Sequence, residues 1–158
     1  MPTPSPLPTW FEYPIQVHPQ HTDYGGVVWH GTYIAWLESA RVECLRAAGA
    51  SFEQLITTGY DLPVVKMDIR YRRPLTLGTS AVVKTRLAPV TGIRLNWLYE
   101  IETVGPTTQI CLTGQVTVVA VNVRDRKIAR QLPAELKSML AQVTRYFELR
   151  PDSFARNR

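Results

Sequence analysis

Residues 21–43 read HTDYGGVVWHGTYIAWLESARVE, and this stretch decides the fold. It begins as a loop broken by Gly25 and Gly26 and continues as an amphipathic helix that is expected to start near His30. Apolar side chains recur along the helix at helical spacing, as Tyr33, Trp36, Leu37, Ala40, Cys44, Ala47 and Ala48. Gly49 is suited to end the helix, because glycine readily adopts the left-handed conformation that follows a last helical turn. A helix with one continuous apolar face packs against a sheet.

The rest of the chain shows the period of two that is typical of half-buried strands. Strands are predicted at about residues 11–17, 65–72, 81–87, 95–101 and 107–122. Pro14 makes the first of them an edge strand or a bulge, and Pro133 opens a final helix that runs to about Phe147. The order strand, helix, four strands, helix predicts an α+β protein in which one long helix lies on an antiparallel sheet.

One protomer buries only one face of such a sheet well, so a homo-oligomer is expected, at least a dimer. The predicted strand at 107–122 has apolar residues on both faces near its end. We therefore expect this strand to help join the protomers, as a homodimer or a homotetramer.

Length and composition define a single domain without a membrane segment. The 158 residues are 20% charged and 45% hydrophobic, as in ordinary soluble domains. No apolar run approaches the roughly 20 residues of a membrane helix, and no secretory signal pattern opens the chain, so we expect a cytoplasmic protein. Its two cysteines fit reduced thiols. We expect a disordered leader at 1–9, one domain at 10–148 and a flexible basic tail at 149–158.

The formal net charge of +5 is unevenly distributed. One basic cluster is Arg70, Arg72 and Arg73, and a second extends from Arg124 to the end of the chain. Basic patches suggest an anionic partner. Because the chain has no zinc-finger spacing, no glycine-rich aromatic RNA-binding motif and no helix-turn-helix pattern, a phosphorylated small molecule is favoured over nucleic acid. The clustered arginines are equally compatible with the solvated face of a strand.

Asp23 is the residue for which the sequence indicates a catalytic role. It lies in the loop, seven residues ahead of the expected helix start at His30. A helix start offers free backbone N–H groups and a partial positive charge. A carboxylate held beside it supplies a base or a nucleophile next to a site that stabilises an oxyanion, and these two parts can cleave an ester or thioester without serine, metal or cofactor. The competing interpretation is an aspartate that only shapes a turn.

Other candidate groups carry less weight. His18 and His21 are three residues apart, but no third ligand has suitable spacing, so solvated loop histidines are favoured over a metal site. The absence of a Gly-x-Ser-x-Gly motif argues against a serine hydrolase. Cys44 is expected in the core, and Tyr33 and Trp36 are interpreted as core or interface residues more than as a substrate cage.

A resemblance to a known family becomes specific at residues 23–33, DYGGVVWHGTY, followed by Glu38-Ser39-Ala40-Arg41. This pattern resembles the signature of hotdog-fold acyl-CoA thioesterases, in particular the 4-hydroxybenzoyl-CoA thioesterase group with its Tol-Pal-associated acyl-CoA thioesterase branch. The segment Arg70–Leu75 resembles the strand-ending segment of that family. The resemblance implies a curved antiparallel five-stranded sheet wrapped around a long central helix, here followed by a C-terminal helix, with active sites at dimer interfaces.

The resemblance also assigns roles residue by residue. Asp23 falls on the catalytic carboxylate, and His30 falls where the helix start presents a backbone N–H to the thioester carbonyl. Gly26 falls on the glycine that lets the loop turn tightly. Trp29 stands where many relatives carry tyrosine or phenylalanine, which bears on the acyl group more than on the chemistry. The residues expected to contact substrate are Gly26, Val27, Trp29, Tyr33, Arg72, Arg73, Arg124, Arg126 and Lys127.

The implied reaction is hydrolysis of an acyl-CoA thioester to the free acid and coenzyme A, with no metal and no cofactor beyond the coenzyme A of the substrate. Asp23 acts either as a general base or as a nucleophile, and arginines or Lys127 meet the phosphates. Three other functions are weighed against it. They are an acyl-acyl-carrier-protein thioesterase, a non-catalytic acyl-CoA-binding hotdog protein and a hotdog dehydratase. Asp23 argues against the binding protein, and a dehydratase needs a histidine and an acid that are paired differently. The acyl group stays open.

Overall fold

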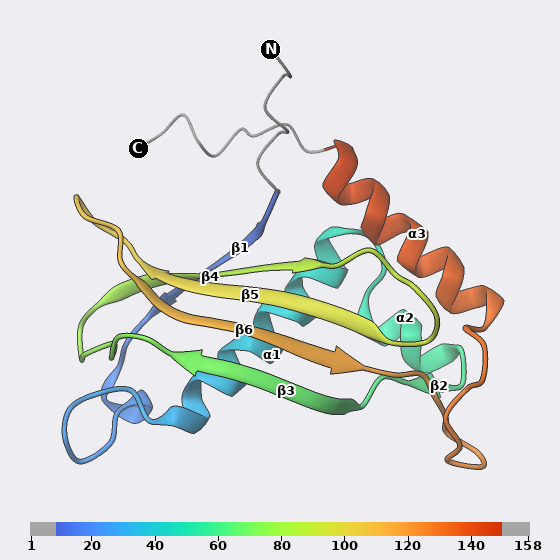
Figure 1. Ribbon diagram of the computed structural model, residues 1–158, viewed down its shortest axis with the longest axis horizontal. Coiled ribbons are helices and arrows are strands. Elements are labelled where there is room, and N and C mark those ends of the chain that lie inside the picture. Colours follow the sequence, from blue (N-terminus) through green and yellow to red (C-terminus); the bar gives the residue numbers. More distant parts are fainter. Residues whose placement is uncertain (1–8, 150–158) are drawn as a thin grey trace.

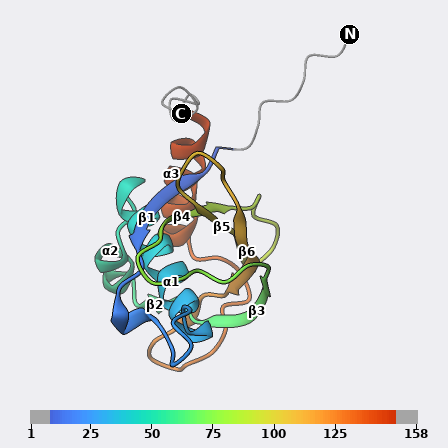
Figure 2. The ribbon, with the colours of Figure 1, turned by 90° about the vertical axis from the view of Figure 1, so that its left-hand side faces the viewer.

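The computed structural model describes residues 9–149, and its centre is a five-stranded antiparallel sheet curved around one long helix. The strands lie in the order β1-β4-β5-β6-β3. Their bounds are β1 Phe11–Gln16, β3 Val64–Tyr71, β4 Ser80–Leu87, β5 Leu95–Thr103 and β6 Ile110–Val118. The long helix is α1 (His30–Ala47), and α3 (Ala134–Leu149) lies at one end of the sheet (Figure 1). Figure 2 shows the sheet wrapped around α1 when the molecule is seen from its end.

The apolar face of α1 fills the concave side of the sheet. Tyr33, Trp36, Leu37, Ala40 and Cys44 are buried as predicted, and Leu45 joins them. They pack against inward-facing residues of the sheet, among them Val83, Trp97, Tyr99, Ile101, Leu112 and Val116. The predicted apolar face ends earlier than expected, because Ala47 is exposed and Ala48 only partly buried where the helix stops. Gly49 has a φ of +79°, which confirms its role at the helix end.

The edges of the sheet are β1 and β3. The strand β1 pairs only with β4, and Pro14 is exposed on it, so the edge position predicted from Pro14 is confirmed. Among residues 9–149 the strand β3 pairs only with β6, and nearly all of its residues are exposed, although alternating burial was expected. A strand at an open edge has no neighbour to cover its outer side, which explains the difference.

The region between α1 and β3 holds elements that the strand-and-helix pattern did not predict. A short helix α2 (Phe52–Thr57) follows α1, and its start carries a reciprocal capping box between Ser51 and Gln54. The two-residue strands β2 (Tyr60–Asp61) and β7 (Val121–Asn122) pair with one another outside the main sheet. The predicted strand at 107–122 is therefore divided, because its last residues leave β6 to pair with β2.

The protomer contact predicted for residues 107–122 stays a prediction, but the sheet limits how β6 could make it. The strand β6 lies between β5 and β3 and forms ladders with both, so its backbone has no free edge for another protomer. The open edge with exposed apolar side chains is β3. Its exposed members are Val64 (41%), Val65 (46%), Met67 (37%) and Tyr71 (49%).

The predicted final helix is confirmed, since α3 begins directly after Pro133. Its residues Leu136, Leu140 and Val143 are buried against the body of the domain. Most of the predicted leader and tail lies outside the described residues, in segments 1–8 and 150–158. Within residues 9–149, no helix is long and apolar enough to cross a membrane.

Candidate active site

The loop before α1 is a small closed hairpin whose backbone holds Asp23 in place. The Asp23 N–H donates to the Val27 carbonyl at 2.8 Å, and the Gly26 N–H donates to the Asp23 carbonyl at 3.1 Å. Gly26 has a φ of +76°, a conformation that a residue with a Cβ atom rarely adopts. The predicted tight turn is therefore present, and glycine is what permits it.

A second set of hydrogen bonds fastens this loop to the segment after β3. The Val28 N–H donates to the Leu75 carbonyl at 2.9 Å, and the Leu77 N–H donates to the Gly26 carbonyl at 3.3 Å. The Tyr33 hydroxyl of α1 accepts a hydrogen bond from the Leu75 N–H at 3.1 Å. These contacts join three segments that are far apart in sequence, so the loop, the helix and the end of β3 form one unit.

The Asp23 carboxylate is exposed and partly engaged. Its Oδ1 accepts a hydrogen bond from the Gly25 N–H at 2.8 Å, which is the turn-shaping role that an aspartate often plays. Within the described chain, no donor to Oδ2 is found. One oxygen therefore fixes the orientation of the carboxylate, and the other is available to a water molecule or a substrate.

The start of α1 keeps backbone donors available. Its N-cap residue is Trp29, whose side chain makes no capping hydrogen bond. The N–H groups of Trp29 and Thr32 bond to backbone carbonyls, whereas those of His30 and Gly31 have no partner in the part of the chain that the structure describes. A Cβ atom at Gly31 would lie 2.2 Å from the Trp29 ring, so glycine is needed for the indole to cover this turn. The helix start thus presents two neighbouring free N–H groups with the positive end of the helix dipole.

The end of β3 brings basic side chains to the same place. The Cys111 carbonyl accepts the N–H groups of both Arg72, at 2.8 Å, and Arg73, at 3.2 Å. Burial raises the pKa of the Cys111 thiol, and the nearby Arg73 charge offsets part of that rise. The Arg72 guanidinium is already engaged, because its Nε donates to the Thr113 hydroxyl at 3.1 Å. Thr113 pairs with Arg70, so Arg72 extends over the outer face of the sheet, and Arg73 is the freer cation.

These segments enclose a pocket of about 310 Å³. Its lining residues are Asp23, Val28, His30, Tyr33, Tyr71, Arg72, Arg73 and Pro74. Five of them were predicted from the sequence as site residues. Tyr71 was missed as a site residue although its strand was predicted, because only the tertiary fold shows that its hydroxyl donates to the His30 carbonyl at 3.0 Å. Its place at the end of β3, directly before the two arginines, is the one signal that could have found it.

The other predicted residues lie outside this pocket. Gly26 and Val27 shape the loop, and Trp29 covers the first helical turn. The phosphate contacts predicted for Arg124, Arg126 and Lys127 stay a prediction, but these residues do not line this pocket within one protomer. Their loop follows β7, at the opposite end of the sheet from the start of α1 (Figure 1). The cause is the pairing of β7 with β2, which carries this loop away from the end of β3.

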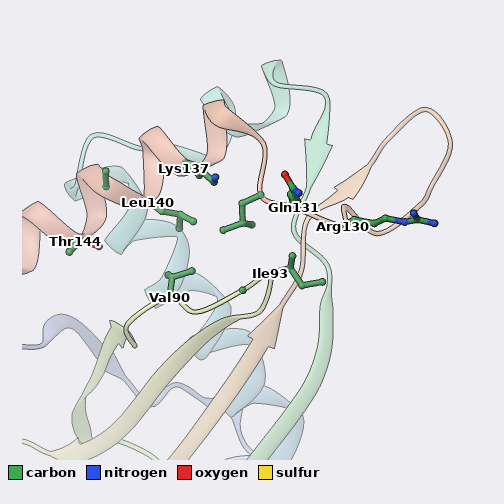
Figure 3. A pocket seen from close by; sticks show the side chains of 10 residues that line it. Val90, Ile93, Arg130, Gln131, Lys137, Leu140 and Thr144 are labelled. Carbon is green, nitrogen blue, oxygen red and sulfur yellow. The ribbon is translucent and has the colours of Figure 1, made fainter.

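A larger pocket of about 520 Å³ lies between α3 and the turn that joins β4 to β5. Figure 3 shows Leu140 and Val90 in this pocket, with the Arg130 side chain extending away from it. No carboxylate and no histidine line it. It therefore lacks the groups that could carry hydrolysis, and the smaller pocket is the candidate active site.

The two remaining histidines are engaged with one another. The His18 N–H donates to the Nδ1 atom of His21 at 3.0 Å, and the two rings stack at 5.5 Å. Within residues 9–149, no cluster of three or more histidine, cysteine, aspartate or glutamate side chains is placed to hold a metal ion.

Comparison with known proteins identifies the family of this chain. The sequence profile of the thioesterase-like superfamily matches residues 17–143, so this chain belongs to that superfamily, and the predicted hotdog fold is confirmed. The chain is 46% identical over 134 residues to a Synechocystis protein named "Putative esterase sll0410", covering 85% of this chain and 80% of that protein. It is 30% identical to the acyl-CoA thioester hydrolase YbgC of Escherichia coli O6:H1, covering 82% of this chain and 97% of that protein.

A solved structure is similar over most of its length. It is Slr0204, a 1,4-dihydroxy-2-naphthoyl-CoA thioesterase from Synechocystis, with a TM-score of 0.73 and 25% sequence identity. The match covers 84% of this chain and 96% of that structure. The predicted resemblance to thioesterases of the hotdog fold is therefore confirmed from sequence and from structure.

Proposed function

We propose that this protein is an acyl-CoA thioesterase in which Asp23 and the start of α1 carry out hydrolysis. The observation that carries the proposal is one pocket that holds an oriented carboxylate, two arginines and His30, the first residue of α1, whose N–H has no partner among the described residues. Relatives of similar length are named thioesterases and thioester hydrolases. A binding protein that only retains an anionic thioester gains nothing from a carboxylate in the same pocket.

The thioester carbonyl lies at the start of α1, where the His30 N–H stabilises the negative charge that develops on its oxygen. Asp23 either removes a proton from a water molecule that attacks the carbonyl carbon, or attacks that carbon itself to form an anhydride that water then hydrolyses. Both routes release the thiol of coenzyme A and the free acid. Preorganised hydrogen-bond donors of this kind usually make the largest single contribution to the rate enhancement of such a reaction.

The direct test is a panel of aromatic, short-chain and long-chain acyl-CoA substrates, with free thiol release as the readout. We expect turnover of at least one class. The same acyl group attached to acyl carrier protein decides between carriers, and a higher kcat/KM on that carrier would favour the alternative function. Binding of acyl-CoA without turnover of any member would contradict the catalytic proposal.

Arg73 is expected to act on the carrier and not on the chemistry. Replacing Arg73 with alanine should raise KM for acyl-CoA about tenfold at low ionic strength with little change in kcat, because a phosphate contact is shared by ground and transition states. Arg72→Ala should have the smaller effect, since the Arg72 guanidinium is held by Thr113. The rise in KM should shrink as salt increases.

The matched control is Arg70→Ala, which removes an exposed charge from the outer face of β3, the strand that leads into Arg72 and Arg73. If Arg73→Ala and Arg72→Ala together keep the parent KM at low ionic strength, the arginines are a solvated face. The phosphates must then be sought at Arg124, Arg126 and Lys127.

We also propose a homodimer in which β3 pairs with the same strand of a second protomer. Its open edge and its exposed apolar residues support this. Antiparallel self-pairing would place the end of β3, at the pocket, beside the start of the partner's β3. In one protomer the loop with Arg124 follows β7, next to β2 and the start of β3, so the dimer would bring this loop towards the partner's pocket.

The cytoplasm is the compartment we propose for the protein. Cys44 and Cys111 are both buried and are not joined in a disulfide, which fits a reducing compartment.

A further inference from the structure

One hydrogen bond joins the end of β3 to the start of α1. The Tyr71 hydroxyl donates to the His30 carbonyl oxygen at 3.0 Å, between residues 41 positions apart. In an α-helix the carbonyl of residue 30 also accepts the N–H of residue 34. The phenol is therefore an additional donor, and helix geometry by itself does not require it.

The peptide unit that receives this bond lies at the start of α1, and it joins Gly31 to His30, which lines the candidate active site. The His30 carbonyl and the Gly31 N–H belong to one amide group, and in a helix they point in opposite directions along the axis. The Gly31 N–H is one of the two donors at the start of α1 that have no partner among the described residues. A hydrogen bond to the oxygen of an amide polarises the group and strengthens hydrogen bonding by its N–H.

We propose that Tyr71 is a positioning residue for hydrolysis, whose hydroxyl polarises the His30–Gly31 amide so that the Gly31 N–H donates a second hydrogen bond to the oxyanion beside the His30 N–H. This inference rests on the proposed thioesterase function. It assigns to Tyr71 and Gly31 roles that the sequence pattern did not indicate.

The surroundings of Tyr71 fit this role. Its ring contacts the edge of Tyr33 at 5.4 Å between centroids, which holds the phenol over the first turn of α1. A tyrosine hydroxyl is protonated at neutral pH and can donate, and burial raises the pKa of Tyr71 further above its ordinary value. The side chain is 49% exposed, so loss of its hydroxyl removes little from the core.

The first test is Tyr71→Phe, which keeps the ring and removes the donor. Loss of a whole oxyanion donor costs about 10²–10³-fold in kcat. Polarisation of a donor by a second hydrogen bond strengthens the donor's own hydrogen bond by only about 10–30%. We therefore expect kcat to fall about two- to eightfold, with KM close to the parent value, because the oxyanion exists only near the transition state. The matched control is Tyr60→Phe, which removes a hydroxyl from β2 outside the pocket. A Tyr71→Phe protein with parental kcat would overturn the inference.

The second test separates polarisation from a mechanical clamp. Mono-, di- and trifluorotyrosine at position 71 keep the hydroxyl and make it progressively more acidic. At a pH where all these phenols are protonated, kcat should rise with the acidity of the phenol while KM stays constant. A kcat that is flat across the series would show a clamp and overturn the inference. Failure of the parent enzyme to hydrolyse any acyl-CoA would instead refute the proposed function, so the two failures are distinguishable.

Discussion

Asp23→Asn is expected to lower kcat by about 10²–10⁴-fold, the usual effect of losing a general base. Asparagine has the same shape and can still accept the Gly25 N–H through its side-chain oxygen, so the loop should keep its conformation. It cannot take a proton from water, and it is a poor nucleophile. The measurement is steady-state hydrolysis of the preferred acyl-CoA, together with calorimetric binding of a non-hydrolysable thioether analogue, whose affinity should change little.

The control for charge is Glu135→Gln, which removes an exposed carboxylate from the first turn of a different helix, α3. Its kcat should match that of the parent. A folded Asp23→Asn protein with near-normal turnover would leave Asp23 with the turn-shaping role alone. The catalytic assignment would then be wrong.

Met67→Asp is expected to dissociate the proposed dimer. Met67 lies in the middle of β3 and is 37% exposed on the open edge. Taking an unpaired carboxylate out of water costs several kcal/mol, and a dimer would carry two copies of it. A loss of about 4 kcal/mol raises the dissociation constant roughly 10³-fold. Sedimentation velocity at micromolar concentration should show a dimer for the parent and a monomer for the variant.

Activity should fall with the dimer, because the candidate pocket lies at the end of this same edge, where the partner protomer would cover it in the proposed dimer. The matched control is Val104→Asp, which places the same charge on an exposed apolar residue after β5, away from β3. A parent protein that sediments as an active monomer would refute the dimer. A Met67→Asp protein that stays dimeric would move the interface to another surface.

Local sequence patterns were sufficient to predict the helix and the loop that position the candidate active site. The apolar spacing from Tyr33 to Cys44 predicted α1 and its buried face, because helical periodicity is a property of neighbouring residues. Pro14 also predicted an edge strand from a local property, because proline has no N–H to donate to a second neighbouring strand. The glycine-broken loop around Asp23 was also correctly predicted, as Gly26 shows by its positive φ.

Patterns failed where a residue's environment depends on distant partners. The alternation at 65–71 predicted a half-buried strand, yet the strand is largely exposed because it ended up at the edge of the sheet. The strand at 107–122 was predicted as continuous, but its last residues pair with β2, a strand too short to show a period. Arg124, Arg126 and Lys127 were predicted to contact phosphates because of their charge, and charge alone could not show that the pairing of β7 with β2 places their loop at the far end of the sheet from α1's start.

The sequence by itself determined the α+β class, the central helix with its buried face and the loop that holds Asp23, since each follows from contacts within a few residues. The tertiary structure decided which side chains share the pocket. The bond between Tyr71 and His30 spans 41 positions, and the bond between Tyr33 and Leu75 spans 42. No local period encodes such pairs, because they form only when the curved sheet brings the end of β3 to the start of α1.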